Sequence, residues 1–82
     1  MPRPTLTLIS RGCCHLCEDM ETALRPLLAE FAAGLEVLDV DADANLEERY
    51  DERVPVLLHG DRELCHYFLD VAGVSDYLSK IG

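Results

Sequence analysis

Two periodicities of apolar and polar positions run through the first part of the chain. Residues 5–9, Thr-Leu-Thr-Leu-Ile, are β-branched or apolar and lead into a turn signal at residues 10–12, which is typical of a strand. From residue 16 to residue 31 apolar side chains recur every three or four positions. This spacing predicts an amphipathic helix that begins near Cys14 and ends at residues 33–34, Ala-Gly.

The middle of the chain predicts a second strand and a short helix. Residues 35–41, Leu-Glu-Val-Leu-Asp-Val-Asp, form the strand, and the acidic segment from residue 43 to residue 51 has room for two helical turns. We expect Leu46 and Tyr50 to face inward from those turns. Asp39 and Asp41 are interpreted as carboxylates at the strand end or facing solvent.

The last third predicts a hairpin and a closing helix. Residues 55–59 and 62–66 flank Gly60-Asp61, a two-residue signal for an antiparallel hairpin. Asp70 is the expected N-cap of the final helix. The buried face of that helix is expected to consist of four residues: Val71, Val74, Tyr77 and Leu78.

The resulting order, β-α-β-α-β-β-α, predicts an α/β fold with a four-stranded mixed sheet and helices on its faces. The chain has 82 residues, which is enough for one domain spanning residues 1–82 and one modest core. We expect this domain to be monomeric.

Charge and cysteine content narrow the classes of function. Lys and Arg number 7 against 16 Asp and Glu, a formal net charge of −9, so neither nucleic acid nor an anionic membrane is an expected partner. The apolar runs are too short to span a bilayer, and the N-terminus lacks the pattern of a signal peptide. We therefore expect a soluble cytosolic protein, in which four cysteines are more often reactive or metal-binding than structural.

The motif Cys14-His15-Leu16-Cys17 lies between the first predicted strand and the first predicted helix. Two cysteines at this spacing can close a disulfide and open it again. Only a thiolate attacks a disulfide, and the unpaired amides and dipole of a helix N-terminus favour a negative charge by roughly 0.3–1 kcal/mol. Cys14 is expected to receive this help and Cys17 less of it. Arg11 and a protonated His15 add positive potential, which the acidic residues that follow oppose.

The element order and this motif, together with Val54-Pro55 before the third strand, resemble the glutaredoxin-like branch of the thioredoxin fold over nearly the whole chain. The resemblance implies a thiol-disulfide oxidoreductase that acts on small or protein disulfides. Cys14 would be its nucleophile and Cys17 the resolving cysteine. Glutathione would be a possible reductant, with no bound cofactor and no metal.

The resemblance also assigns the residues around the cysteines. The Val54–Pro55 bond would be cis, with the Val54 backbone beside Cys14 to pair with substrate. Arg11 stands where glutaredoxins commonly place a basic residue for a glutathione carboxylate. Asp70 stands near the position of the acid that holds the glutathione amine, and His15 lies beside the nucleophile.

Three departures from the family pattern concern the same site. His15-Leu16 replaces the proline that most relatives carry between the cysteines. Tyr67-Phe68-Leu69-Asp70 stands where glutaredoxins have Gly-Gly and then an acid. Leu8 stands where thioredoxins keep a buried carboxylate, so a thioredoxin-type proton relay is not expected.

Other interpretations use the same cysteines. Cys14, Cys17, Cys65 and His66 could complete a tetrahedral zinc site, although the last two are adjacent in sequence. An iron-sulfur cluster shared between protomers through Cys14 is a variant of this hypothesis. In a third interpretation the chain is a non-catalytic interaction module whose cysteines only pack.

The two remaining cysteines and two of the histidines are not expected to take part in the chemistry. Cys13 is interpreted as a spectator beside Cys14, and Cys65 as a small core hydrophobe. His59 and His66 are expected in the turn and at the surface.

Overall fold

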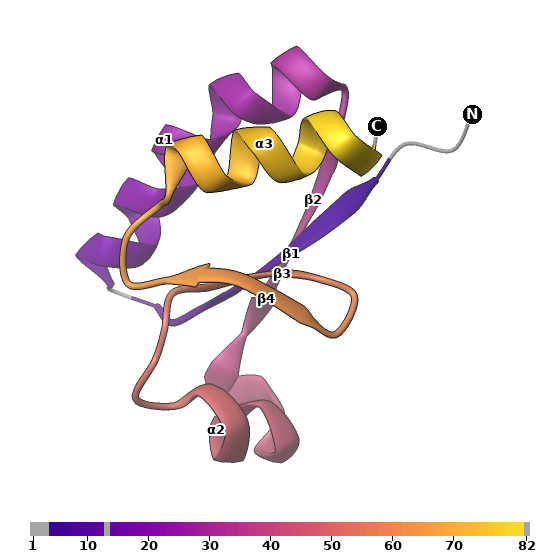
Figure 1. Cartoon of the computed structure of the whole chain (residues 1–82). Coiled ribbons are helices and arrows are strands. Elements are labelled where there is room, and N and C mark those ends of the chain that lie inside the picture. Colours follow the sequence, from indigo (N-terminus) through magenta and orange to yellow (C-terminus); the bar gives the residue numbers. More distant parts are fainter. Residues whose placement is uncertain (1–3, 13, 82) are drawn as a thin grey trace.

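A mixed sheet organises the chain, with its four strands in the order β2-β1-β3-β4 over the residues that the structure describes (Figure 1). This structure is a computed structural model, and it describes residues 4–12 and 14–81. Its elements are, in chain order, β1 (Thr5–Ser10), α1 (His15–Phe31), β2 (Gly34–Asp39), the 3-10 helix η1 (Val40–Ala42), α2 (Ala44–Tyr50), β3 (Val56–His59), β4 (Arg62–His66) and α3 (Val71–Ile81). The predicted order and the predicted mixed sheet are confirmed.

Strand β1 pairs with two other strands, β2 and β3. It runs parallel to β2, which is possible because α1 provides the long crossover that parallel neighbours need. It runs antiparallel to β3, where Ile9 pairs with Val56. The hairpin from β3 to β4 turns at Gly60, whose φ of 62° suits glycine in a two-residue hairpin loop.

Helices cover both faces of the sheet, as Figure 1 shows with α1 and α3 on one side and α2 on the other. The larger core cluster joins β1 and β3 to α1 and α3; its buried members are Leu6, Leu8, Met20, Leu24, Leu27, Leu57, Val74 and Leu78. The smaller cluster lies on the opposite face and consists of Ile9, Val40, Val56 and Leu58, with Leu46 and Tyr50 packed against it. The inward orientation predicted for Leu46 and Tyr50 is confirmed.

Helix α1 ends differently from the prediction. It continues past Pro26 to Phe31, and Ala32 then adopts a left-handed conformation with φ 53°. The Ala33 amide donates to the Leu28 carbonyl at 2.9 Å, so a carbonyl of the last turn is satisfied as in a Schellman-type end. Gly34 is not the cap but the first residue of β2.

Strand β2 is shorter than predicted. It ends at Asp39, and Val40 and Asp41 belong to η1. The Asp39 carboxylate accepts a hydrogen bond from the Asp41 amide at 2.9 Å, and such local side-chain bonds compete with the ladder of a sheet. Val40 is nevertheless fully buried, because the turn directs it into the smaller core cluster.

Helix α3 matches the predicted face only in part. Val74 and Leu78 are buried and Tyr77 is half-buried, but Val71 is 52% exposed. The prediction for Val71 is wrong, because no neighbouring element covers the first turn of α3 at this residue. Asp70 caps the helix as predicted, since its carboxylate accepts from the Gly73 amide at 3.1 Å.

Within residues 4–12 and 14–81, none of the helices is both long enough and apolar enough to cross a bilayer.

Candidate functional site

Three connecting segments meet at one end of the sheet (Figure 1). They are the turn between β1 and α1, the segment that enters β3, and the segment that leaves β4. Ile9 pairs with Val56, so the antiparallel register carries Pro55 toward Ser10, four residues before Cys14. The Cys14–Cys17 motif and the Val54-Pro55 pair are far apart in sequence. Because of this register, they meet at the same place in the fold.

Cys14 is the N-cap of α1. Its backbone is extended, with φ −105° and ψ 112°, and its Sγ accepts a hydrogen bond from the Cys17 amide at 3.2 Å. Its carbonyl accepts from the Glu18 amide at 3.1 Å, the first bond of the helix. The half-buried sulfur thus lies at the end of the helix where backbone amides and the dipole favour negative charge.

Cys17 lies one turn further into α1 and is only 4% exposed. Burial, together with its interaction with the Cys14 sulfur, raises the pKa of Cys17 to about 11; a hydrogen bond with the Arg11 backbone acts in the opposite direction. Removing a thiol from water disfavours its charged form. The two cysteines are therefore chemically unequal, with one half-buried sulfur at the helix end and one buried, protonated thiol behind it.

Pro55 follows a cis peptide bond with Val54 and is fully buried. The Pro55 carbonyl accepts a hydrogen bond from the Tyr67 amide at 2.8 Å, which ties the segment after β4 to the segment before β3. Val54 packs against the smaller core cluster and precedes β3, whose pairing with β1 begins at Val56. The cis bond implied by the resemblance is present, and the role of the Val54 backbone stays a prediction.

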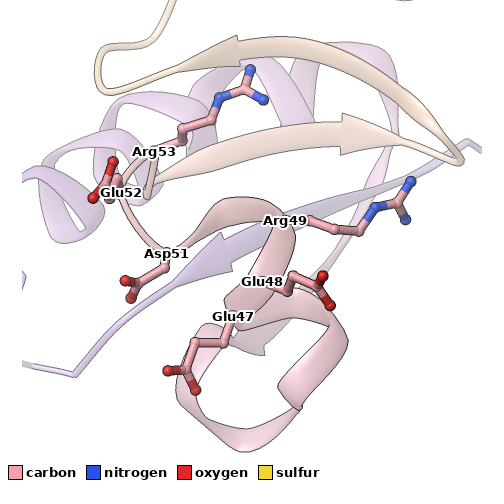
Figure 2. Close-up of a pocket in the computed structure, with 6 residues that line it drawn as sticks. All are labelled: Glu47, Glu48, Arg49, Asp51, Glu52 and Arg53. Atoms are coloured by element: carbon pink, nitrogen blue, oxygen red, sulfur yellow. The ribbon is translucent and has the colours of Figure 1, made fainter.

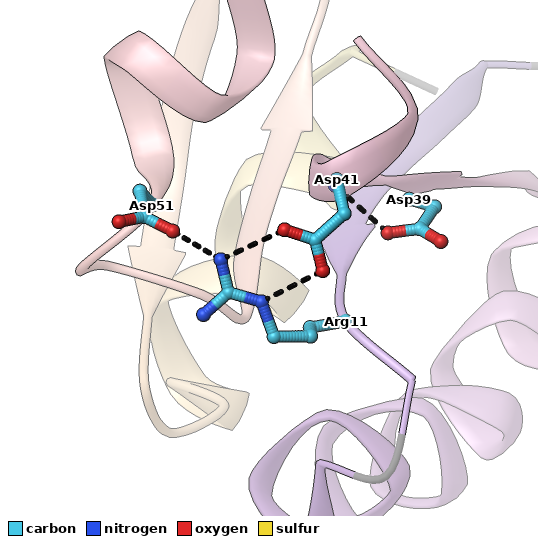
Figure 3. Close-up of polar contacts among 4 residues, drawn as sticks. All are labelled: Arg11, Asp39, Asp41 and Asp51. Carbon is cyan, nitrogen blue, oxygen red and sulfur yellow. Dashed lines mark hydrogen bonds and ion pairs between the residues drawn. The ribbon is translucent and has the colours of Figure 1, made fainter. Parts of the chain in front are cut away.

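Arg11 is engaged by two carboxylates (Figure 3). Its Nε and Nη2 donate to the two oxygens of Asp41 at 3.0 and 3.1 Å, and its Nη2 also donates to Asp51. The hydrogen bonds to Asp41 and Asp51 raise the pKa of Arg11 further above its usual range. Asp39 turns its carboxylate to the Asp41 backbone instead. Arg11 therefore links the turn before the cysteines to η1 and to the C-terminal end of α2.

The other residues assigned by the resemblance lie at the margins of the site. His15 is exposed on the first turn of α1. Asp70 is exposed, and its carboxylate is used by the Gly73 amide. Cys13 lies outside the described residues, so its interpretation as a spectator stays a prediction.

Two features of the site were missed at the sequence level. Tyr67 has a φ of 63°, and its hydroxyl donates to the Glu52 carbonyl at 2.6 Å. The carboxylates of Asp41 and Asp51 hold Arg11 from 30 and 40 residues away. The presence of Tyr67-Phe68 in place of a glycine pair was a signal for the unusual segment at Tyr67. No local pattern indicates the bonds between Arg11 and the two carboxylates.

The described residues do not assemble the zinc site considered above. Among residues 4–12 and 14–81, no three His, Cys, Asp or Glu side chains are grouped so that they could hold a metal ion. Cys65 pairs with Leu57 in the sheet and packs against the larger core cluster. His66 is exposed, with its Nδ1 3.1 Å from Glu63.

A surface hollow of about 300 Å³ lies at α2 and the loop that follows it. Its described lining is entirely charged: Glu47, Glu48, Arg49, Asp51, Glu52 and Arg53. Figure 2 shows these side chains spreading in different directions rather than converging on one point. Arg53 is also bonded to Glu63. This arrangement is a solvated charged surface and does not present a set of groups aimed at one ligand.

Known proteins resemble this chain along almost its whole length. Residues 5–79 match the family described as Glutaredoxin-like domain (DUF836). The solved structure of protein Ne2328 from Nitrosomonas europaea is 40% identical, with 94% of this chain and 93% of that chain covered and a TM-score of 0.83. Protein XcR50 from X. campestris is 36% identical over 92% of this chain and 96% of its own, with a TM-score of 0.65.

More distant similarities agree with this assignment. The uncharacterized protein Rv0508 of Mycobacterium tuberculosis is 29% identical over 75 residues, which are 85% of this chain and 77% of that protein. Thioredoxin 1 from Thermosipho africanus TCF52B, at 16% identity and a TM-score of 0.66 over 94% of this chain and 92% of its own, shares the fold. The chain has a thioredoxin fold and belongs to the glutaredoxin-like domain family (DUF836).

Proposed function

We propose that the protein is a thiol-disulfide oxidoreductase in which Cys14 is the nucleophile and Cys17 resolves the intermediate. One observation carries this proposal: the Cys14 Sγ accepts the Cys17 amide at 3.2 Å at the N-terminus of a 17-residue helix. A hydrogen bond to the charged form and the positive end of the helix dipole both favour a thiolate. A thiolate is the species that attacks a disulfide.

The reaction is a two-electron exchange. The Cys14 thiolate attacks one sulfur of the substrate disulfide, so that a mixed disulfide forms and the first substrate sulfur leaves as a thiolate. Cys17 loses its proton to solvent and attacks the Cys14 sulfur, which releases the second substrate thiolate. The substrate is reduced to two thiols, and the protein is oxidised to the Cys14–Cys17 disulfide.

The raised pKa of Cys17 determines the order of the two attacks in this reaction. In the free protein the Cys17 thiol stays protonated because it is buried and because the Cys14 sulfur lies beside it. Once Cys14 is bonded to substrate it no longer carries a charge. The part of the shift that Cys14 causes is then removed, and Cys17 becomes a stronger acid in the intermediate than in the free protein.

The surroundings of the pair support an extended substrate. Val54 precedes the ladder between β1 and β3, and its backbone is proposed to pair with a substrate segment at the edge of the site. The same activity fits a reducing compartment such as the cytosol, where thiols are kept reduced.

Glutathione is one of two candidate reductants of the Cys14–Cys17 disulfide; the other is a thioredoxin reductase. The side chains that the resemblance assigns to it are engaged within the protein: Arg11 by Asp41 and Asp51, and Asp70 by the Gly73 amide. Glutathione would have to share or displace these bonds. Glutathione and a thioredoxin reductase are therefore compared as electron sources.

The test is disulfide reduction with two substrates and two electron sources. A glutathione mixed disulfide and a protein disulfide are each offered to the protein with either glutathione or a thioredoxin reductase as reductant. Without added reductant, the Cys17→Ser variant is expected to stall with substrate bonded to Cys14, which mass spectrometry identifies. Cys13→Ser and Cys65→Ser are the matched controls and should keep turnover. Inactivity in all four combinations, or trapping at Cys13 rather than Cys14, would contradict the proposal.

A further inference from the structure

An apolar groove of about 250 Å³ opens beside the candidate site. One wall is the first part of α1, with Leu16, Met20 and Ala23. The other wall is the segment after β4, with Tyr67 and Phe68, and the first residue of α3, Val71. Leu16 is the residue between His15 and Cys17, and the Tyr67 amide is bonded to the Pro55 carbonyl. Both walls are therefore attached to the segments that form the site.

The groove leaves large apolar side chains in water. Phe68 is 71% exposed and Val71 is 52% exposed. A contiguous exposed apolar surface, unlike scattered exposed residues, marks a place where another molecule binds. Its position next to the reactive pair indicates that this molecule is the substrate.

The charge around the groove indicates which substrates fit. Among the described residues that line it, Asp19 alone carries a charge, and Asp70 adjoins the wall at Leu69 and Val71. The whole chain carries a formal −9, and the Arg11 guanidinium is already bonded to two carboxylates. This field repels glutathione, which is a net anion, and attracts a cationic segment.

The size of the groove is sufficient for one large apolar side chain. Sites for small organic ligands usually enclose roughly 300–1,000 Å³, and this groove lies below that range. A peptide bonded to Cys14 through its own cysteine would extend past Leu16, where a neighbouring large apolar side chain could be buried between the two walls.

We propose that the groove binds a large apolar residue next to the cysteine of a polypeptide disulfide, with a nearby Lys or Arg facing Asp19. This inference rests on the proposed function, since it names the substrate class of the same cysteine pair. The preferred substrates are polypeptide disulfides with apolar and basic neighbours, and glutathione mixed disulfides are poor substrates.

The test compares three peptides, each with one cysteine disulfide-bonded to mercaptoethanol. The first has Leu beside the cysteine and Lys nearby, the second has Ser for the Leu, and the third has Glu for the Lys. Hydroxyethyl disulfide, which has no peptide part, reports the exchange chemistry alone. The wild-type kcat/KM is expected to be about tenfold higher for the first peptide than for the second, a factor in line with burial of one large apolar side chain.

Three variants test which residues of the protein cause the preference between peptides. Phe68→Ser is expected to remove most of the preference for Leu over Ser, expressed as the ratio of the two kcat/KM values. Asp19→Asn should reduce the preference for Lys over Glu several-fold. Val37→Ser is the matched control, because Val37 is 47% exposed on β2 and does not line the groove. Equal rates for the Leu and Ser peptides, or a preference that survives Phe68→Ser, would overturn the inference.

A second measurement separates this inference from the proposed function. The Leu peptide with Ser in place of its cysteine cannot react, and it is titrated into isotope-labelled protein while amide shifts are recorded by NMR. Shifts are expected at residues 67–71 and are expected to weaken in Phe68→Ser. Inactivity toward hydroxyethyl disulfide and toward all three peptides refutes the proposed function, whereas the absence of these shifts refutes the groove, whichever way the activity assay turns out.

Discussion

Burial of the Cys17 thiol makes the stability of the protein fall at alkaline pH. The pKa of Cys17 in the folded protein is about 11, against an ordinary value of 9.0. A group whose pKa is raised by folding stabilises the folded state below its unfolded pKa, and this contribution is lost as the pH rises through the folded pKa. The relevant window is therefore pH 9 to 11.

The magnitude follows from the size of the shift. Two pKa units at about 1.4 kcal/mol each correspond to a loss of about 3 kcal/mol in the free energy of unfolding when Cys17 is fully ionised in both states. About 1 kcal/mol of this should already be lost at pH 10. The full value is a large share of the total stability of a chain of this size, which is of order 4–12 kcal/mol.

The assay is urea unfolding at several pH values from 7 to 11, with a phosphine reductant to keep every thiol reduced. The difference in unfolding free energy between the wild type and Cys17→Ala isolates the contribution of this thiol from the other groups that titrate in the range. That difference should stay constant to about pH 9 and then fall. Cys65→Ala is the control: its half-buried thiol has a pKa raised by burial, and it should remove a smaller part of the pH dependence. A difference that does not change between pH 8 and pH 11 would show that Cys17 is not desolvated in the folded protein.

Three further predictions concern stability. Leu24→Ala should cost about 2–5 kcal/mol in urea unfolding, because Leu24 is fully buried in the larger core cluster; a cost below about 1 kcal/mol would contradict that packing. Ala32→Gly should raise stability by up to about 1 kcal/mol and Tm by several degrees, because Ala32 has a φ of 53° that glycine adopts without strain; a lower Tm would count against this helix end. Asp43→Ala should cost about 1 kcal/mol in thermal unfolding, because its carboxylate accepts the Asn45 amide at 2.8 Å as the N-cap of α2, and an unchanged Tm would argue against the cap.

The periodic patterns predicted the elements well because each element buries one side. The spacing of apolar residues in α1 and the turn at Gly60-Asp61 are local signals, and both elements formed as predicted. The end of α1 was less predictable, because Gly34 does not cap the helix but begins β2. A Cβ on Gly34 would lie 3.3 Å from the Thr5 Oγ1, so the glycine serves the close pairing of β1 with β2, and Ala32 takes the left-handed position instead.

The candidate site was predictable only where local sequence or resemblance pointed to it. The motif from Cys14 to Cys17 indicated the N-terminus of a helix, and the resemblance implied the cis bond at Pro55. The bonds from Arg11 to Asp41 and Asp51 depend on the tertiary fold, which brings the ends of β1, β2 and α2 together. Periodicity placed Val71 on the buried face of α3, but it could not show that this turn has no covering neighbour.

The central claim is that the position of the Cys14 sulfur at the start of α1 makes it reactive in neutral buffer. Its most direct test is the rate of alkylation of each cysteine by iodoacetamide at pH 7, followed by mass spectrometry in the folded protein and in urea; this neutral reagent is not repelled by the acidic chain. We predict that Cys14 reacts several-fold faster in the folded state than in the unfolded state, while Cys17 is protected by folding. Equal rates for Cys14 in the two states, or a folded Cys17 that reacts faster than Cys14, would contradict the account.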